Sequence, residues 1–256
     1  MERLKDKIVF ISGASSGIGK ACAEAFAVEK ANLILAARRF EILKEEAERL
    51  GKTYGIKTKI IKLDVRDFNE VKQAVDSLDE DWNKIDILVN NAGLARGFDK
   101  IYEGNLASWE EMIDTNLKGL LYVTRNLLPG MIERKRGQVI NIGSTAGHEV
   151  YPNGNVYCAT KFAVNALTKG IRMDCLEHGI KVSTVDPGIV ETEFSIVRFS
   201  GNKERADKVY EGLDPLTAAD IADAVVYCAT RPEHVNINEV ILTPLAQASS
   251  TQVIRK

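Results

Sequence analysis

The sequence has no long run of apolar residues and almost no excess of charge of either sign. No stretch of about 18 apolar residues occurs, which excludes a membrane-spanning helix of ordinary length. The formal net charge is −2 at pH 7, so a basic surface for nucleic acid is not expected. Only four apolar residues stand together near the start, at 8–11, which is too short for the core of a signal peptide. We therefore expect a cytoplasmic protein with neither membrane nor nucleic acid as partner.

Cysteine and histidine are also sparse. The sequence contains Cys22, Cys158, Cys175, Cys228, His148, His178 and His234. These residues stand apart from one another and show no CxxC spacing. We expect reduced thiols rather than disulfides, and no metal site.

What the sequence does have is a regular alternation of apolar runs and helical patterns. Of the 256 residues, 45% are hydrophobic and 27% charged, which is typical of a globular chain. Apolar runs typical of buried strands lie at 7–12, 31–37, 59–65, 85–93, 137–144 and 181–188. Helical patterns lie between them at 19–30, 40–55, 68–83, 108–135 and 155–178. This order predicts an α/β fold, a single-domain Rossmann-type doubly wound parallel sheet over 1–256 with helices on both faces.

The segment after Pro187 is different, because it is polar and charged and lacks the strand pattern. In open α/β sheets, ligands bind beyond the carboxyl ends of the strands. An irregular segment at that edge is a candidate substrate lid, which we place at about 189–214.

The first predicted strand runs into the glycine-rich segment GASSGIG, at 13–19. Glycines there permit a sharp turn and close approach of the backbone to a ligand, and the following helix would direct its N–H groups at a phosphate. The spacing GxxxGxG differs from the usual GxGxxG fingerprint, so the motif alone also fits an ordinary strand-to-helix turn. Its position between a strand and a helix favours a nucleotide site.

The second predicted strand ends in Arg38 and Arg39, with no acid before Glu41. A fold that selects NAD usually carries an acid there for the ribose 2′-hydroxyl, whereas two guanidinium groups suit a 2′-phosphate. An arginine pair can also be the solvated start of a helix. The position favours the phosphate, and we predict NADP(H) as cofactor.

Tyr157 and Lys161 lie four residues apart on a predicted helix and therefore share one face. The alternative is an ordinary exposed helix face. Lowering a tyrosine pKa from about 10 to about 7 takes about 4 kcal/mol. A positive charge about 4 Å away supplies roughly that much at an effective dielectric constant of about 20. The pair is therefore a candidate acid/base with its activating cation.

Two further polar residues complete the candidate site. Ser144 ends a predicted strand, where its hydroxyl could hold a substrate carbonyl oxygen. Asn116 lies inside a long helical pattern, where its alternative role is a local backbone hydrogen bond that bends the helix.

These motifs together resemble the short-chain dehydrogenase/reductase family over nearly the whole chain. The resemblance rests on GASSGIG (13–19), LDV (63–65), NNAG (90–93), Asn116, Ser144, YCATK (157–161) and PG (187–188). It implies a catalytic tetrad in which Tyr157 is the acid/base, Lys161 lowers its pKa and bonds the nicotinamide ribose, and Ser144 orients the substrate oxygen. Asn116 would hold a water that links Lys161 to solvent.

The resemblance also implies which residues contact the cofactor. They are Gly13, Ser15, Ser16, Gly17, Ile18, Gly19, Arg38, Arg39, Asp64, Val65, Asn91, Ala92, Gly93, Tyr157, Lys161, Pro187, Gly188, Val190 and Thr192. The family usually has threonine before the first glycine, where this chain has Ser12. Some NADP-dependent members carry a basic residue where this chain has Ser16, so the phosphate contact would depend on Arg38, Arg39 and hydroxyls such as that of Ser15.

Further segments, including PGIVETEFSIVRF and HVNINEVILTPLAQAS, resemble the NADP-dependent serine and 3-hydroxy-acid dehydrogenases of the family. This implies transfer of hydride between NADP⁺ and the β-hydroxyl of a small acid such as L-serine, L-allo-threonine or 3-hydroxypropionate, or the reverse reduction of a 3-oxo acid. Arg198, within the lid candidate, is our hypothesis for holding the substrate carboxylate, with a solvated loop arginine as the alternative.

Two other functions stay open. A carbonyl reductase of the same family would act on 3-oxoacyl thioesters or bulkier ketones, and a binding protein would keep the fold without catalysis. The intact set of four tetrad residues argues against the second. The family resemblance also implies a homotetramer.

Overall fold

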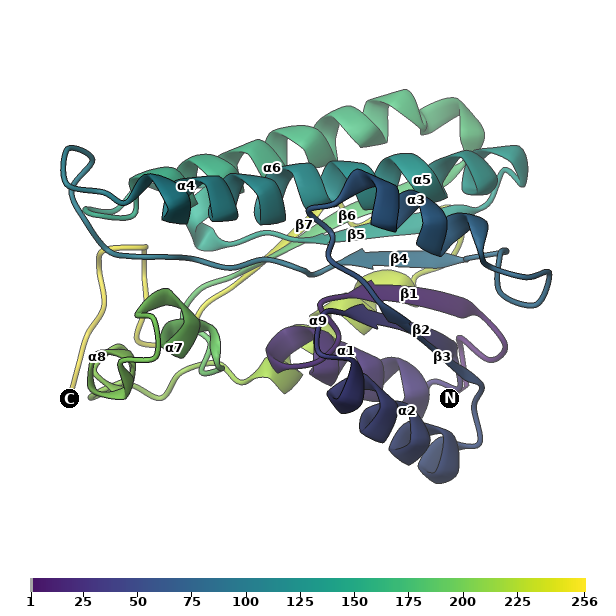
Figure 1. The fold of residues 1–256 in the computed structure, drawn as a ribbon, viewed down its shortest axis with the longest axis horizontal. Helices are drawn as coiled ribbons and strands as arrows, with labels where there is room; N and C mark the ends of the chain where they lie inside the picture. Colours follow the sequence, from purple (N-terminus) through teal and green to yellow (C-terminus); the bar gives the residue numbers. More distant parts are fainter. Residues whose placement is uncertain (1) are drawn as a thin grey trace.

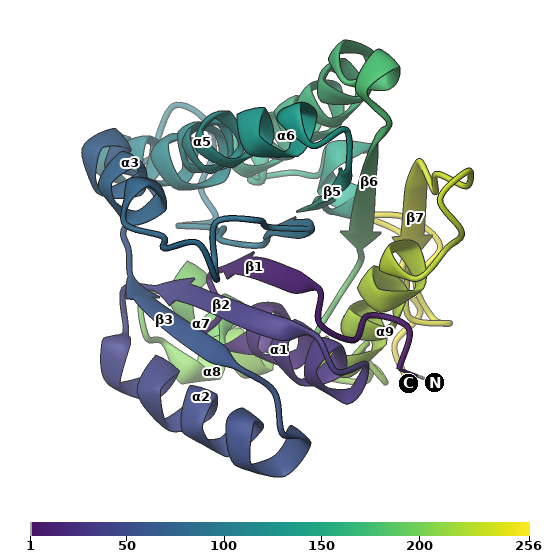
Figure 2. The same cartoon turned by 90° about the vertical axis from the view of Figure 1, so that its right-hand side faces the viewer.

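The computed structural model describes residues 2–256 and contains one sheet of seven parallel strands in the order β3-β2-β1-β4-β5-β6-β7 (Figures 1 and 2). The order reverses between β1 and β4, as in a doubly wound fold. The strands are β1 (Ile8–Ser12), β2 (Asn32–Ala37), β3 (Thr58–Lys62), β4 (Ile87–Asn90), β5 (Gly137–Ile142), β6 (Ile180–Pro187) and β7 (Glu239–Leu242).

Helices cover both faces of the sheet. In Figure 1, α1, α2 and α9 lie on one face and α3 to α6 on the other, while α7 and α8 lie beyond one edge of the sheet. The helices are α1 (Gly17–Val28), α2 (Phe40–Tyr54), α3 (Phe68–Asp76), α4 (Leu106–Ile113), α5 (Leu120–Glu133), α6 (Asn155–Asp174), α7 (Phe194–Arg198), α8 (Lys203–Asp207) and α9 (Ala218–Ala229). A π-helix, η1 (Asp114–Gly119), joins α4 to α5, and short 3-10 turns, η2 (Thr145–Gly147) and η3 (Leu176–His178), precede and follow α6.

The strands are apolar on both sides because each side is covered. In β1, Val9 and Ile11 belong to the core beneath α1 and α9, and Ile8 and Phe10 to the core beneath α5. Successive side chains of a strand point to opposite faces, so a strand buried on both faces reads as a continuous apolar run. This explains why the runs of the sequence predict the sheet directly.

The predicted single α/β domain with a parallel sheet and helices on both faces is confirmed. Element ends differ in places. The helix expected at 68–83 ends at Asp76, the strand expected at 85–93 spans Ile87–Asn90, and the helix expected at 108–135 is interrupted by η1. The segment at 189–214 contains the two short helices α7 and α8. Within residues 2–256, no helix has the length and apolar content needed to cross a membrane. The cytoplasmic location stays a prediction.

Candidate active site

The loop between β1 and α1 brings backbone N–H groups to one end of a cavity. Gly13 has a φ of +67° and Gly17 a φ of +50°, which favour glycine. A Cβ on Gly19 would lie 2.3 Å from the carbonyl oxygen of Gly13, so a side chain there would displace the loop. Ser16, at the N-cap of α1, makes no side-chain capping bond within residues 2–256. The first N–H groups of α1 are thus available to an anion.

Ser12, the residue before this loop, ties it to the end of β4. The N–H groups of Asn91 and Ala92 both donate to Ser12 Oγ at 3.1 Å. Asn91 Nδ2 in turn donates to the carbonyl oxygens of Ser12 and Gly13. The serine hydroxyl thus joins the two loops, and both are positioned by neighbouring parallel strands.

A cavity of about 1130 Å³ opens along the carboxyl edge of the sheet. The predicted cofactor residues line it with the exception of Gly19, which is buried against Gly13 of the loop. Ser144, Tyr157, Lys161 and Arg198 also line it, whereas Asn116 lies behind its wall. Ligand pockets commonly measure roughly 300–1,000 Å³, so this cavity has room for a dinucleotide and a small substrate together.

At one end of the cavity Arg39 is held by two partners. Its Nε donates to Ser15 Oγ at 3.1 Å, and its Nη1 lies 3.0 Å from Glu193 Oε2. Arg38 lies on the same wall. Asp64, which also lines the cavity, pairs with Arg66, whose hydrogen bond holds the pKa of Asp64 below its usual value. Two guanidinium groups and a hydroxyl are therefore available to one anionic group.

Three of the predicted reactive residues, Ser144, Tyr157 and Lys161, line the same cavity. Ser144 follows β5, and its Oγ accepts a hydrogen bond from the N–H of Ala146 at 3.1 Å. Tyr157 lies in the first turn of α6, with only 9% of its surface exposed. Burial raises the pKa of Tyr157 above its usual value, and a hydrogen bond with Ser144 lowers it by less.

Lys161 lies one turn further along α6. Its Nζ donates to the carbonyl oxygen of Ile142 at 2.9 Å and lies 5.9 Å from the centroid of the Tyr157 ring. Burial lowers the pKa of Lys161 to about 8. The expected depression of the tyrosine pKa is wrong for the groups of the protein alone, because removing the phenol from water outweighs the nearby charges.

Asn116 lies in η1, the π-helical turn between α4 and α5. Its Oδ1 accepts from the N–H of Leu94 at 2.8 Å, while its Nδ2 donates to the carbonyl oxygen of Leu94 and to Thr160 Oγ1. Asn116 therefore joins the loop after β4 to α6. Single-turn π-helices occur often at functional sites, and the sequence pattern predicted only a long helix with a possible bend.

Arg198 reaches the cavity from the end of α7. Its guanidinium carbon lies 5.2 Å from the centroid of Tyr157, 5.5 Å from those of Phe98 and Tyr151, and 5.8 Å from that of Phe194. Its Nη2 donates to the hydroxyl of Tyr151. Its Nε is buried and has no hydrogen-bond partner in the described part of the chain. A donor left in this state beside a reactive phenol is suited to an incoming acceptor.

Sequence reasoning did not find the three aromatic neighbours of Arg198. Phe98 and Tyr151 lie in loops that follow β4 and β5, and Phe194 begins α7. Their only sequence signal is an aromatic residue shortly after a strand end or within the lid candidate. Aromatic faces attract a guanidinium group and exclude water from it, which fixes the place where Arg198 can receive a ligand.

Comparison with known proteins agrees with this geometry. The profile of the short chain dehydrogenase family matches residues 7–203. An NADP-dependent 3-hydroxy acid dehydrogenase of Schizosaccharomyces pombe is 43% identical over 257 residues, covering 100% of this chain and 99% of the relative. A serine 3-dehydrogenase of Rhizobium radiobacter is 41% identical, covering 97% and 98%.

A solved structure, the closed form of serine dehydrogenase complexed with NADP⁺, is similar to this chain with a TM-score of 0.91 and 41% identity, covering 97% of this chain and 99% of that one. The family profile spans most of the chain, and the relatives match it from end to end. The chain belongs to the short-chain dehydrogenase family.

Proposed function

We propose that this protein is an NADP-dependent oxidoreductase that transfers hydride between the β-hydroxyl of a small 3-hydroxy acid and NADP⁺, or reduces the corresponding 3-oxo acid. Its relatives carry the names 3-hydroxy acid dehydrogenase and serine 3-dehydrogenase, and a similar structure contains NADP⁺. The observation that carries the proposal is the position of Arg198, stacked over Tyr157 with a buried donor that has no partner among residues 2–256.

The cavity fits a dinucleotide that carries a 2′-phosphate. The uncapped start of α1 and the glycine loop line the cavity, so their backbone N–H groups could bind a pyrophosphate. Arg39, which follows β2 and is already bonded to Ser15, lines the cavity with a charged fork that could bind a 2′-phosphate. Bound there, the cofactor supplies or accepts the hydride.

The protein's own groups would handle the proton. Tyr157 is protonated at neutral pH because burial raises its pKa, so its hydroxyl can donate to a substrate carbonyl oxygen during reduction. In the oxidation direction only the phenolate form of Tyr157 would accept the proton of the substrate hydroxyl, and positive charge nearby would favour that form. Ser144 would hold the same oxygen. Lys161, anchored on the carbonyl of Ile142, would bond the nicotinamide ribose and bring positive charge to the phenol. Asn116 would hold a water beside Lys161.

The substrate carboxylate would bind Arg198. A guanidinium group can donate two parallel hydrogen bonds to a carboxylate, and the four aromatic rings keep the contact out of water. The segment at 189–214 would act as the substrate lid, since Phe194, Arg198 and Tyr210 line the cavity from it. In the described conformation this segment already holds Arg198 over the ring of Tyr157, so its opening would admit the substrate.

The quaternary structure that we propose is a homotetramer. Helices α5 and α6 expose Leu121 and Phe162, and the edge strand β7 exposes Ile241. Apolar side chains on neighbouring elements are suited to burial against a second copy.

The test is the reduction of NADP⁺, followed by the absorbance of NADPH, with L-serine, L-allo-threonine and 3-hydroxypropionate as substrates. We expect turnover with these acids and its loss in Tyr157→Phe, while the variant still binds NADPH. Absence of turnover with all three acids, together with activity on 3-oxoacyl thioesters or bulky ketones, would replace the proposed substrate class by that of the wider family.

A further inference from the structure

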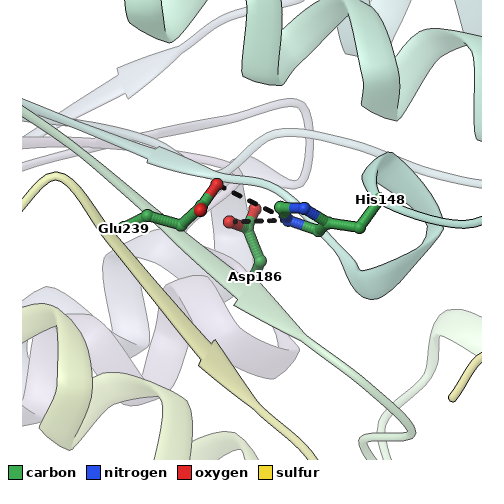
Figure 3. A group of neighbouring side chains, drawn as sticks. All are labelled: His148, Asp186 and Glu239. Atoms are coloured by element: carbon green, nitrogen blue, oxygen red, sulfur yellow. Dashed lines mark ion pairs between the residues drawn. The ribbon is translucent and has the colours of Figure 1, made fainter.

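Three side chains that the proposed reaction does not use meet beside the sheet (Figure 3), and one of them, Asp186, accepts a hydrogen bond from the N–H of Ser144. His148 follows η2, Asp186 lies on β6 and Glu239 begins β7. Their ligand atoms all lie within 4.8 Å of one another. His148 Nε2 is 3.3 Å from Asp186 Oδ2 and 3.6 Å from Glu239 Oε1. The three elements thus bring one imidazole and two carboxylates to a single point.

Asp186 is completely buried, and only one of its oxygens is satisfied. Its Oδ1 accepts from the N–H of Ser144 at 3.1 Å and from Thr184 Oγ1 at 2.8 Å. Its Oδ2 accepts no hydrogen bond from any of residues 2–256 and is directed toward His148 and Glu239 (Figure 3). A buried carboxylate oxygen without a donor is costly in free energy, and a cation or a proton removes that cost.

The contact with Asn165 indicates which nitrogen of the His148 imidazole presents a lone pair. Asn165 Nδ2 donates to the carbonyl oxygen of Gly147 at 3.1 Å, which fixes the orientation of the amide. The same Nδ2 lies 3.1 Å from His148 Nε2. An amide nitrogen can only donate, so Nε2 presents its lone pair. In this tautomer a nitrogen lone pair and two carboxylate oxygens lie within 4.8 Å of one another.

We propose that His148, Asp186 and Glu239 bind a divalent transition-metal ion, of which Zn²⁺ fits best. Zn²⁺ binds imidazole nitrogen and carboxylate oxygen at about 2.0–2.2 Å, which separates the ligands of a tetrahedral site by roughly 3.3–3.6 Å. The two distances from His148 Nε2 agree with this spacing. The ion would take the lone pair that Nε2 shares with Asn165, and Asn165 would keep its bond to Gly147.

The ion would have a positioning role rather than a catalytic one. Asp186 Oδ1 holds the backbone of Ser144, and a Cβ on Gly143 would lie 1.6 Å from that oxygen, so the carboxylate is packed tightly against the chain. An ion on Oδ2 would fasten this carboxylate to His148 and to β7. The turn that carries Ser144 would then be fixed to two strands at once.

The test is metal binding by the full-length chain. After treatment with a chelator and its removal, Zn²⁺ is titrated by calorimetry, and Co²⁺ is added as a spectroscopic substitute whose visible absorption reports a tetrahedral site. We expect one ion per chain and a higher melting temperature with Zn²⁺. His148→Ala should weaken binding by at least about 10- to 100-fold, the loss that follows removal of even an outer partner.

Two further variants distinguish a loss of metal binding from a loss of folding. Glu239→Gln keeps the shape of a half-exposed side chain on an edge strand and should also weaken binding. His178→Ala removes a histidine that pairs with Glu177 at 3.6 Å and should leave binding unchanged. The proposal is overturned if the wild-type chain binds no ion, because a proton on His148 then satisfies the cluster, or if His148→Ala and Glu239→Gln bind Zn²⁺ as tightly as wild type.

Discussion

Tyr157 and Lys161, two ionisable side chains of α6, are both buried. Burial disfavours the charged form of each side chain. Burial raises the pKa of Tyr157 and lowers that of Lys161 to about 8. A surface tyrosine and lysine would have no such shifts, and the protein gains no stability from them. Groups with shifted pKa values in a cavity are typical of functional sites. At such sites the arrangement that the reaction needs lowers the stability of the fold.

Lys161 gives a prediction about stability and pH. Its folded pKa of about 8 lies below the usual 10.5, so the unfolded chain binds more protons between these values and the free energy of unfolding rises with pH there. Below about pH 8 the full cost of burying the ammonium is present, about 3 kcal/mol. Lys161→Met should therefore stabilise the protein by about 2 kcal/mol at pH 7, after the loss of one hydrogen bond, and abolish activity.

Urea denaturation at pH 7 and pH 10 measures this effect. The increase in the free energy of unfolding that Lys161→Met produces should be smaller at pH 10, where the wild-type lysine is neutral in the folded state. Lys169→Met, on the exposed face of the same helix, should change stability by less than about 0.5 kcal/mol at either pH. A gain from Lys161→Met that grows with pH would contradict the argument.

Arg198 gives a prediction about specificity. Arg198→Ala should lower kcat/KM for 3-hydroxy acids by about 10- to 100-fold, since charge-assisted hydrogen bonds contribute about 1.5–3 kcal/mol. The loss should fall mainly on KM and should be small for an alcohol of the same length without a carboxylate. Arg205→Ala is the control, because Arg205 lines the same cavity but stacks on Phe199 at 4.7 Å. Equal losses for the acid and the alcohol would assign Arg198 to packing instead.

At the scale of elements, the glycine loop and α1 form one structural unit. The conformations of Gly13 and Gly17, the close approach of Gly19 to Gly13 and the free start of α1 all depend on the same few residues. A change that shifts the loop should therefore reduce stability and cofactor binding together.

Gly19→Ala tests this coupling. The new Cβ would lie 2.3 Å from the Gly13 carbonyl oxygen, and overpacking of this kind costs typically about 1–3 kcal/mol. We expect a lower free energy of unfolding in urea and weaker NADPH binding. Gly170→Ala in α6 has open space around its Cβ and should stabilise the protein by about 1 kcal/mol. Normal NADPH binding by Gly19→Ala would disprove the coupling.

Arg39, which follows β2, forms an ion pair with Glu193 of the lid candidate. The pair is exposed, so it contributes little to stability, but Glu193 competes for the group that would bind a 2′-phosphate. Arg39→Ala should raise the Kd of NADPH by about 10- to 100-fold and leave that of NADH unchanged. Glu193→Gln should tighten NADPH binding by up to about fivefold. Fluorescence titration measures both, and a parallel loss for NADPH and NADH in Arg39→Ala would exclude a phosphate contact.

Elements and local motifs were predictable from the sequence because each depends on a short stretch of chain. The apolar runs predict the strands, and the i, i+4 spacing places Tyr157 and Lys161 on one face. The π-turn at Asn116 was not predictable, because its cause is a set of contacts with Leu94 and Thr160 on other elements. The tyrosine pKa was misjudged for a similar reason, since burial depends on the whole fold.

At the scale of the molecule, sites are made by residues that the fold brings together from distant positions. Arg198 meets Phe98 and Tyr151 only because the lid candidate folds over the ends of β4 and β5. The sequence separates His148, Asp186 and Glu239 widely, and it led to the expectation of no metal site. The parallel sheet places the last two on adjacent strands, with Thr184 opposite Glu239 and Asp186 opposite Ile241. Such arrangements follow from topology rather than from spacing.

The assembly of several chains into an oligomer also belongs to the scale of the whole molecule. As an edge strand, β7 presents unpaired backbone groups on one side, and Ile241 on this strand is 52% exposed. A second copy placed there, and another along α5 and α6, would form the proposed homotetramer. Light scattering should then give a mass of about 113 kDa, four times the 28.2 kDa of one chain.

A charge on one edge strand distinguishes the two edges of the sheet. Ile241→Glu should reduce the mass to that of a dimer, because a carboxylate buried between copies without a partner is strongly unfavourable. Lys62→Glu reverses the charge at an exposed position of β3, the opposite edge, and should leave the tetramer intact. A wild-type mass of 28.2 kDa would contradict the assembly and leave the apolar side chains of β7, α5 and α6 in contact with water.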